Sequence, residues 1–542
     1  MTERSRRAAL AAVVLASIAL YSASLRFAFT YDDVLSVVHH PGVHASRLGA
    51  ELLLRDFWGS AFTDLSGPGT WRPLVTLSYW VDARLGRNLP WLFHASNLAY
   101  FALFIVAADR FLRTWASDRL SDTARLCTLA GFGALTIHVD VVPSITGRAE
   151  IFAALLSLIA LERVCRDVLR PVDALVIVLA MLGAIASKES ALTTPLIGVV
   201  MAAGRTTRPN RRRVAGMLIL AIVVIGGSLA LRGHLGLPIG PRALYGAELS
   251  NPLRVRPLVA RLLGASEVFA RYLEHAATGI DLCPDYSYAT IVPATSMGLR
   301  AILGVAFVAF GGAWAWCSRR RDPRVLDAVL AFGASYAVIS NVAFASSAIL
   351  ADRNFFFPSF WLLALVALGI GKIESRSRVA KLLVAVCVPL AIATQAIFTM
   401  FATFAWRDNR TLAVYALQTC PSNARMRFLL ATDEDARDRT REAAWQVLVA
   451  TSIVRSFPRA LADDAFPLAW DALPIPARVE RLRQQVGDAE AFRAMQILAV
   501  DLAGAEHMPN TAVLLTEWPT RVPTPDWLRE RLEAIGRGSI AH

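Results

Sequence analysis

Residues 8–33 read AALAAVVLASIALYSASLRFAFTYDD, an apolar run that ends on two adjacent carboxylates. The run is long enough for one membrane-spanning helix, which needs about 20 mostly apolar residues. It follows basic residues at 4–7 and lacks a clear small-residue cleavage site, so we interpret it as a retained first span rather than a signal peptide. Ionisable groups at membrane depth are costly and usually functional, which makes Asp32 and Asp33 the first candidate site.

The whole chain has the composition of an integral membrane protein. Of its 542 residues, 55% are hydrophobic and only 18% charged, whereas soluble proteins carry about 25% charged residues. The net charge of +13 comes from short arginine-rich segments between apolar runs, not from a basic stripe interleaved with aromatic residues, so nucleic acid is not an expected partner. The six cysteines show neither close pairing nor metal-ligand spacing, and we expect Cys283 and Cys420 to stay unpaired.

Eleven apolar segments of helical length recur along the chain. The predicted cytoplasmic segments each carry at least three basic residues, whereas the short outer connections carry one apiece, the asymmetry that orients helices in a bilayer. The pattern predicts eleven spans, with the N-terminus in the cytoplasm and the C-terminal tail outside. The predicted spans are 8–29, 91–113, 124–142, 149–164, 172–188, 190–204, 214–232, 299–317, 324–346, 355–371 and 379–405.

Two predicted outer segments are long, 30–90 and 233–298, and Pro73 suits the first position of a helix in the former. The latter contains an amphipathic stretch, 258–277, that we expect on the membrane surface. From Trp406 the composition becomes that of a soluble helical domain, beginning with a helix–turn–helix compatible with one tetratricopeptide unit. The sequence therefore predicts an all-α membrane domain at 1–405 and a small helical tail at 406–542.

Asp32 and Asp33 have a simpler interpretation as a solvated loop start, or as the cap of a short helix beginning near Val34. We favour a catalytic function, because the pair directly follows the first span and lies beside Phe29 and Tyr31, aromatic residues that suit the membrane interface. A partly desolvated carboxylate has a raised pKa, which is useful to a general base. We prefer Asp32 as the base with Asp33 in support, although adjacent acids can share a titration.

Other polar residues interrupt the predicted outer connections. Lys188 and Glu189 are equally well explained as a self-neutralising turn and as a phosphate anchor. Arg353 is either a snorkelling arginine or a ligand for an anionic headgroup. Arg148 either pairs with the turn of Glu150 or binds a phosphate, which the guanidinium group contacts well.

Less specific signals accompany these residues. His138 and Asp140 could ligate a metal, but no third ligand is near, and a lone histidine is more often structural. Arg72, Asp285 and Tyr286 are ordinary interfacial residues by composition alone.

All of these candidates are predicted to lie on the outer side of the membrane, and this shared location is the argument for one common site. A carboxylate facing several cations suits a lipid-phosphate donor, because the cations stabilise the departing phosphate while the acid takes a proton from the acceptor hydroxyl. The expected phosphate ligands are Arg353, Lys188 and Arg148, in that order. This scheme needs no metal or other cofactor, since the cations carry the charge.

Seven motifs occur in an order that resembles a known family. They are FTYDD (29–33), WRPLVTLS (71–78), FHASN (93–97), His138 through GRAE (147–150), SKE (187–189), DYS (285–287) and DRNFFFPS (352–359). The set covers about 27–430 and is similar to that of the transmembrane and tetratricopeptide-repeat O-mannosyltransferases and their bacterial relatives, within the GT-C glycosyltransferases. The sequence departs from the family where Val139 follows His138 in place of proline, and in a tail with at most one recognisable repeat.

The resemblance implies a GT-C bundle of eleven spans, catalysis through Asp32 and Asp33, and transfer from a polyprenyl- or dolichyl-phosphate-linked monosaccharide to Ser or Thr hydroxyls. The substrate-site candidates that accompany it are Tyr31, Arg72, His94, His138, Glu150, Glu189, Asp285 and Tyr286.

We therefore predict an inverting glycosyltransferase of the bacterial inner membrane that acts on the periplasmic face. Its expected partners are the lipid-linked sugar, a protein or glycan acceptor, and membrane lipids. The weak repeat content of the tail leaves a lipid or surface-glycan acceptor open. An alternative of another class is a membrane scaffold without activity, whose outer helical domain binds partner proteins.

Overall fold

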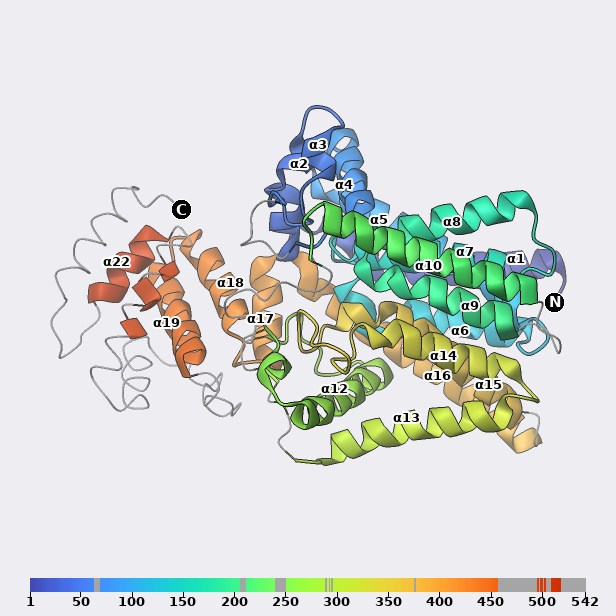
Figure 1. Cartoon of the computed structure of the whole chain (residues 1–542). Helices are drawn as coiled ribbons and strands as arrows, with labels where there is room; N and C mark the ends of the chain where they lie inside the picture. The colour runs from blue at the N-terminus through green and yellow to red at the C-terminus, as the bar shows by residue number, and fades with distance from the viewer. Residues whose placement is uncertain are drawn as a thin grey trace.

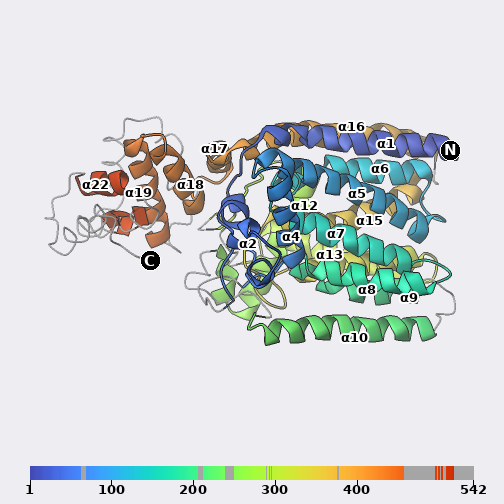
Figure 2. The same ribbon diagram turned by 90° about the horizontal axis from the view of Figure 1, so that it is seen from above.

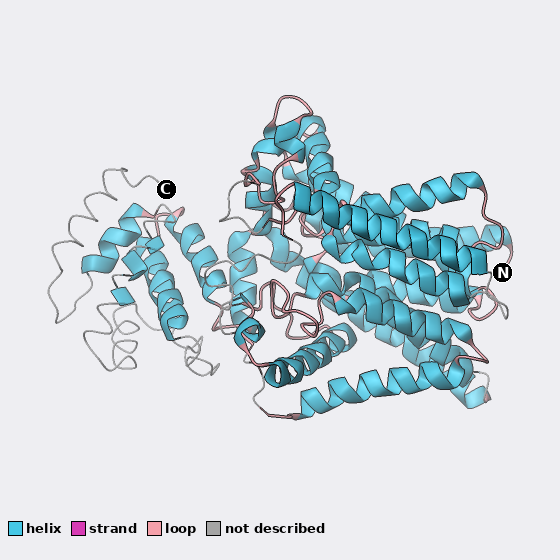
Figure 3. Ribbon diagram, in the orientation of Figure 1, coloured by secondary structure: helices cyan, strands magenta, loops and turns pink. Residues whose placement is uncertain are grey.

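The fold is all-helical, as predicted. The computed structural model describes residues 1–62, 69–204, 211–238, 250–287, 290–291, 293, 296–374, 377–456, 495–496, 498–500, 502–503 and 508–517. Throughout these residues the regular elements are helices, and strand pairing is limited to one isolated bridge between Arg55 and Ala61 (Figure 3).

Each of the eleven predicted apolar segments contains an α-helix, and these helices lie side by side in one elongated bundle (Figures 1 and 2). They are α1 (Glu3–Tyr21), α5 (Pro90–Ala116), α6 (Asp122–Ala134), α7 (Arg148–Val164), α8 (Pro171–Ile185), α9 (Thr194–Gly204), α10 (Arg211–His234), α13 (Leu299–Ser318), α14 (Pro323–Ala337), α15 (Phe356–Glu374) and α16 (Arg378–Thr403).

Six helical stretches in the described part of the chain are long and apolar enough to cross a membrane. They are Glu3–Arg26, Pro90–Ala116, Arg211–His234, Leu299–Ser318, Asp352–Ile373 and Arg378–Arg407, while Pro171–Ile185 and Glu189–Gly204 are apolar but shorter. The chain is thus a multi-pass membrane protein by the length and composition of its helices.

Several helices end earlier than predicted; α1 stops at Tyr21, where the 3₁₀ helix η1 (Ser22–Arg26) follows, and α6 and α14 stop eight and nine residues before the predicted ends of their spans. Helix α6 ends at Ala134 because the N–H of Thr136 donates to Gln395 Oε1 (3.0 Å) instead of continuing the helix; the short 3₁₀ helix η3 (Thr136–Asp140) follows. Helix α14 ends at Ala337, before Asn341 adopts a left-handed backbone (φ 59°), which asparagine tolerates better than most residues.

The first outer segment forms a small cap on one end of the bundle, where α2 (Pro41–His44) and α3 (Ala50–Leu53) pack against α4 (Pro73–Leu85). Helix α4 begins at Pro73, as predicted, because proline's fixed φ and missing N–H suit the first position of a helix. The second outer segment contains the amphipathic helix α12 (Leu258–Thr278), which ends at Gly279 in a left-handed conformation (φ 68°).

The predicted helix–turn–helix of the tail is formed by α17 (Asn409–Thr419) and α18 (Ala424–Asp435). Helices α19 (Thr440–Ser456) and α22 (Pro509–Glu517) follow, and much of the predicted 406–542 domain lies outside the described residues. Residues of α17 such as Leu412 and Ala416 belong to the main hydrophobic core of the bundle, whereas α19 and α22 share a separate core. The predicted boundary at 405/406 therefore does not separate two cores.

The bundle has two chemically different ends. Arginine-rich connections meet at the end that holds the N-terminus, where Arg119 and Lys372 both pair with Asp322 (3.7 and 3.4 Å). The polar motifs of the outer connections meet at the opposite end, next to the helices of the tail (Figure 1). We call the second one the motif end.

Candidate active site

An ion pair between two segments far apart in the sequence stands at the centre of the motif end. Nη1 of Arg353 lies 3.1 Å from Oδ2 of Asp32, and the two side chains remain 29% and 17% exposed. Asp140 supports the arginine by accepting its backbone N–H (3.2 Å). Burial raises the pKa of Asp32, and the guanidinium groups of Arg353 and Arg425 oppose that rise. Asp32 is therefore an accessible carboxylate in a cationic setting.

Asp33 has a different environment from its neighbour. Its carboxylate is buried and accepts the backbone N–H groups of Thr30 (3.1 Å) and Thr146 (3.0 Å). It does not cap the short π-helical turn η2 (Val34–Val38) that follows. Burial raises the pKa of Asp33 to about 7. Asp33 thus fastens the turn after α1 to the loop before α7, while the partly exposed Asp32 faces Arg353.

Tyr31, directly before Asp32, is held from three directions. Its backbone is left-handed (φ 56°), and its N–H donates to Asn409 Oδ1 (2.7 Å). Its hydroxyl donates to Asp285 Oδ2 (2.8 Å), an oxygen that Arg425 Nη1 also contacts at 2.7 Å. Burial disfavours ionisation of Asp285, but Arg425 and nearby hydrogen bonds lower the pKa of this carboxyl to about 2.

Lys188 lies in a second polar cluster beside the ion pair. Its ammonium donates to Asn354 Oδ1 (2.8 Å) and pairs with the carboxylate of Glu150. Glu189 instead turns toward Arg72 (3.4 Å) and accepts the N–H of Trp71 (3.2 Å).

One 3₁₀ turn, η6 (Asp352–Phe355), links these clusters. Asp352 accepts hydrogen bonds from Tyr286 (2.7 Å) and pairs with His275 (2.8 Å); Arg353 reaches Asp32, and Asn354 reaches Lys188. A 3₁₀ helix has three residues per turn, so consecutive side chains point in three directions. The turn therefore distributes three polar groups to three neighbouring places.

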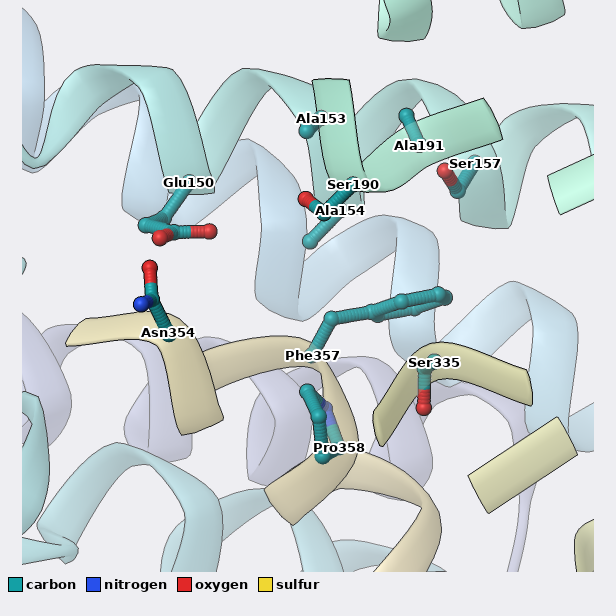
Figure 4. A pocket seen from close by; sticks show the side chains of 10 residues that line it. All are labelled: Glu150, Ala153, Ala154, Ser157, Ser190, Ala191, Ser335, Asn354, Phe357 and Pro358. Atoms are coloured by element: carbon teal, nitrogen blue, oxygen red, sulfur yellow. The ribbon is translucent and has the colours of Figure 1, made fainter. Parts of the chain in front are cut away.

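A small pocket adjoins the Lys188 cluster (Figure 4). Glu150 and Asn354 face each other at one end, and Phe357 extends along the space between α7 and α15 (Figure 4). Small side chains form most of the remaining wall: Ala153, Ala154, Ser157, Ser190, Ala191 and Ser335, with Pro358. The pocket thus has Glu150 and Asn354 at one end and a wall of small alanine and serine side chains along Phe357.

Some predicted site residues do not reach this open region. Arg148 is fully buried, and its guanidinium is occupied by Asp82 (2.7 Å), Asn97 (2.7 Å), Ser78 (2.9 Å) and the carbonyl of Phe93 (2.9 Å). The predicted phosphate contact is corrected accordingly: Arg148 is an interior cation that joins α4, α5 and α7. The sequence correctly predicted the end of the bundle at which Arg148 lies, but not that its side chain is buried.

The histidine candidates and Tyr286 are also interior residues. His138 is fully buried between Phe132 O (3.0 Å) and Ser359 Oγ (2.9 Å), and His94 is buried against Phe27. Tyr286 is buried against Asp352. Within the described residues, we find no group of three or more His, Cys, Asp or Glu side chains placed to hold a metal ion.

Asn409 and Arg425 also contact this site, although no sequence motif singles them out. They lie in α17 and α18, in the predicted tail, and no local spacing relates them to Tyr31. Cys420, which lies between Asn409 and Arg425 in the sequence, is next to Cys283. Both thiols are buried, and they do not form a disulfide.

Comparison with known proteins confirms the family resemblance. The chain is 26% identical over 440 residues to protein O-mannosyl-transferase TMTC3 of Mus musculus, an alignment covering 75% of this chain and 47% of that protein. It is 24% identical to human TMTC3 over the same shares, and 23% identical to mouse TMTC4 over 458 residues, covering 74% of this chain and 60% of the relative.

The chain spans about half the length of the first of these relatives. No protein-family model matches it, and no solved structure does.

Proposed function

We propose that this protein is a membrane glycosyltransferase that moves a monosaccharide from a polyprenyl-phosphate donor to a Ser or Thr hydroxyl of a protein. The observation that carries the proposal is the partly exposed Asp32–Arg353 pair, a carboxylate and a guanidinium whose atoms lie 3.1 Å apart. The relatives are named protein O-mannosyl-transferases, which supports a hexosyl group and a protein acceptor.

The proposed reaction is a single displacement with inversion. Asp32 accepts the proton of the acceptor hydroxyl as its oxygen forms the bond to the anomeric carbon. The bond from that carbon to the donor phosphate breaks on the opposite face, and its electron pair leaves with the phosphate. Arg353 and Lys188 stabilise the charge that develops on the departing phosphate, and no further cofactor is part of the proposal.

The Lys188 cluster and its adjoining pocket support a donor with a lipid chain. In our proposal the phosphate lies between Arg353 and Lys188, and the first isoprene units follow the wall of Ala153, Ala154 and Phe357. Displacing Asn354 from Lys188 would let the ammonium contact the phosphate directly.

We further propose a GT-C arrangement of eleven spans in a bacterial inner membrane, with the N-terminus in the cytoplasm and the motif end in the periplasm. The convergence of arginine-rich connections at the opposite end supports this orientation, because basic loops remain in the cytoplasm.

The decisive experiment replaces Asp32 with Asn and measures transfer of mannose from a polyprenyl-phosphate donor to Ser/Thr peptides in proteoliposomes. A general base contributes roughly 10²- to 10⁴-fold, so a loss in that range is expected. Glu51→Gln, which removes an exposed carboxylate from the same outer segment, is the control.

Wild-type-like transfer by Asp32→Asn would refute the catalytic assignment. Absence of transfer to peptides by the wild-type protein, with loss of an envelope glycan in Asp32→Asn cells, would indicate the alternative acceptor. Unchanged glycans in Asp32→Asn cells would favour the alternative of a membrane scaffold without activity.

A further inference from the structure

Tyr31 adopts a backbone conformation that a bulky residue rarely adopts. Its φ of 56° lies in the left-handed region, where the Cβ atom crowds the following carbonyl. Such conformations persist only where the surrounding structure over-determines them, and they concentrate at functional sites. The groups that hold Tyr31 therefore determine where the next residue, Asp32, points.

Those groups come mostly from the C-terminal helices. We define the Tyr31 clamp as Tyr31, Asp285, Asn409 and Arg425. Asn409 binds the Tyr31 N–H (2.7 Å), and Arg425 contacts both the Tyr31 hydroxyl (3.3 Å) and Asp285 (2.7 Å). The clamp thus fixes the backbone and the ring of one residue at the same time.

The segments that carry the clamp are bound to each other on both sides of it. The hydroxyl of Thr30 donates to the carbonyl of Trp406 (3.2 Å), and the N–H of Ala28 donates to the carbonyl of Arg407 (3.0 Å). On the far side, Asn423 Nδ2 donates to the carbonyl of Asp285 (2.5 Å). The clamp is part of a continuous seam between the catalytic turn and helices α17 and α18.

We propose that Asn409 and Arg425 are positioning residues of the transferase: through the Tyr31 clamp, the C-terminal helices hold the Asp32 carboxylate in the orientation in which it accepts the acceptor proton. The inference rests on the proposed function. A misplacement of about 1 Å at the reacting groups can cost on the order of a hundredfold in rate, so loss of the clamp acts on kcat.

Arg425 also belongs to the charges that face Asp32. The others are Arg353, Arg72, Asp285, the neighbouring Asp33, and Asp140 beside Arg353. The base must be ionised, so transfer falls at low pH as Asp32 becomes protonated. Removing the cationic Arg425 raises the pKa of Asp32 and moves this acidic limb to higher pH. Tyr31→Phe removes the hydroxyl that contacts Asp285 and Arg425, so it is expected to lower kcat. Because it changes none of the charged side chains, it leaves the acidic limb in place.

The test measures kcat, KM for polyprenyl-phosphate mannose, and the acidic limb of the pH profile in full-length protein. The variants are Arg425→Met, Arg425→Lys, Asn409→Ala, Tyr31→Phe and the double variant Tyr31→Phe/Arg425→Met. We expect kcat to fall on the order of ten- to a hundredfold with donor KM unchanged. We also expect Arg425→Lys to keep the acidic limb at its wild-type pH. The kcat of the double variant should fall by less than the product of the two single-variant decreases, as for coupled residues.

Two arginine variants separate positioning from general damage to the tail. Arg427→Met removes the same charge from the same helix, but Arg427 binds Gln446 (2.9 Å) and the carbonyl of Pro421 (3.1 Å), within the tail. It is expected to lower thermal stability without moving the acidic limb. Arg437→Met, at an exposed pair with Asp433, is expected to match wild type in all three measurements.

The inference is overturned if Arg425→Met retains wild-type kcat and limb while Asp32→Asn is inactive. It is also overturned if Arg425→Met raises donor KM at constant kcat, because Arg425 would then bind substrate. If Asp32→Asn itself keeps full activity, the proposed function fails instead, so the two failures are distinguishable.

Discussion

At the scale of residues, the adjacent carboxylates of Asp32 and Asp33 have different surroundings because their side chains leave the turn in different directions. Asp33 points inward, where two backbone N–H groups satisfy it, and Asp32 points to the accessible arginine. An acid whose folded pKa is raised binds more protons in the folded state than in the unfolded chain. Its stabilising contribution is then complete below the unfolded pKa and is lost as pH rises through the folded pKa.

For Asp33 that window runs from its ordinary value of 3.8 to about 7. We predict that Asp33→Asn, which cannot ionise, flattens the fall in stability across this window. Thermal unfolding of the purified protein at a series of pH values measures it, with Glu51→Gln as the control. A pH dependence equal to wild type in Asp33→Asn would contradict the assignment.

A second prediction at this scale concerns Lys188. Lys188→Met leaves Glu150 buried without its cation, which is expected to cost roughly 3–5 kcal/mol of unfolding free energy. The double variant Lys188→Met/Glu150→Gln removes that buried charge and should recover most of the stability. If Lys188 binds the donor phosphate, transfer remains impaired in the stable double variant. Recovery of both stability and transfer would assign Lys188 to structure alone.

At the scale of elements, the sequence located the helices well and the depth of side chains poorly. Apolar runs predicted every helix of the bundle, and Pro73 predicted the start of α4, because these are local properties. The location of Asp32, Lys188 and Arg353 at one end of the bundle was also predictable, since the charge of the connections indicates which of them share an end. The burial of Arg148 depends on Asp82 and Asn97 arriving from other helices, which no local pattern encodes.

The prediction for these helices is that Arg148→Met destabilises the bundle without lowering the specific activity of the protein that remains folded. Asp82 loses its buried cation, with an expected cost of roughly 3–5 kcal/mol, and Arg148→Met/Asp82→Asn should restore part of it. Activity per folded molecule, measured beside thermal unfolding, decides the matter. A selective loss of kcat in the double variant would return Arg148 to the active site.

At the scale of the whole molecule, the two ends of the bundle predict its orientation. In a variant whose native cysteines are replaced, Glu51→Cys should react with a membrane-impermeant maleimide in intact cells. Asp118→Cys, an exposed position at the arginine-rich end, should react only after the membrane is opened. Labelling of both positions, or of the second alone, in intact cells would contradict the proposed topology.

The seam between Tyr31 and the tail joins residues 378 and 394 positions apart. Membrane proteins are synthesised from the N-terminus, so Asp32 leaves the ribosome long before Asn409 and Arg425 do. Under the proposed topology, the turn that carries Asp32 lies on the far side of the membrane before the last predicted span is inserted and α17 and α18 cross. If Asp32 is the base, as proposed, completion of the site is a late step of biogenesis, and a nascent chain halted before residue 425 has Asp32 without the residues that position it.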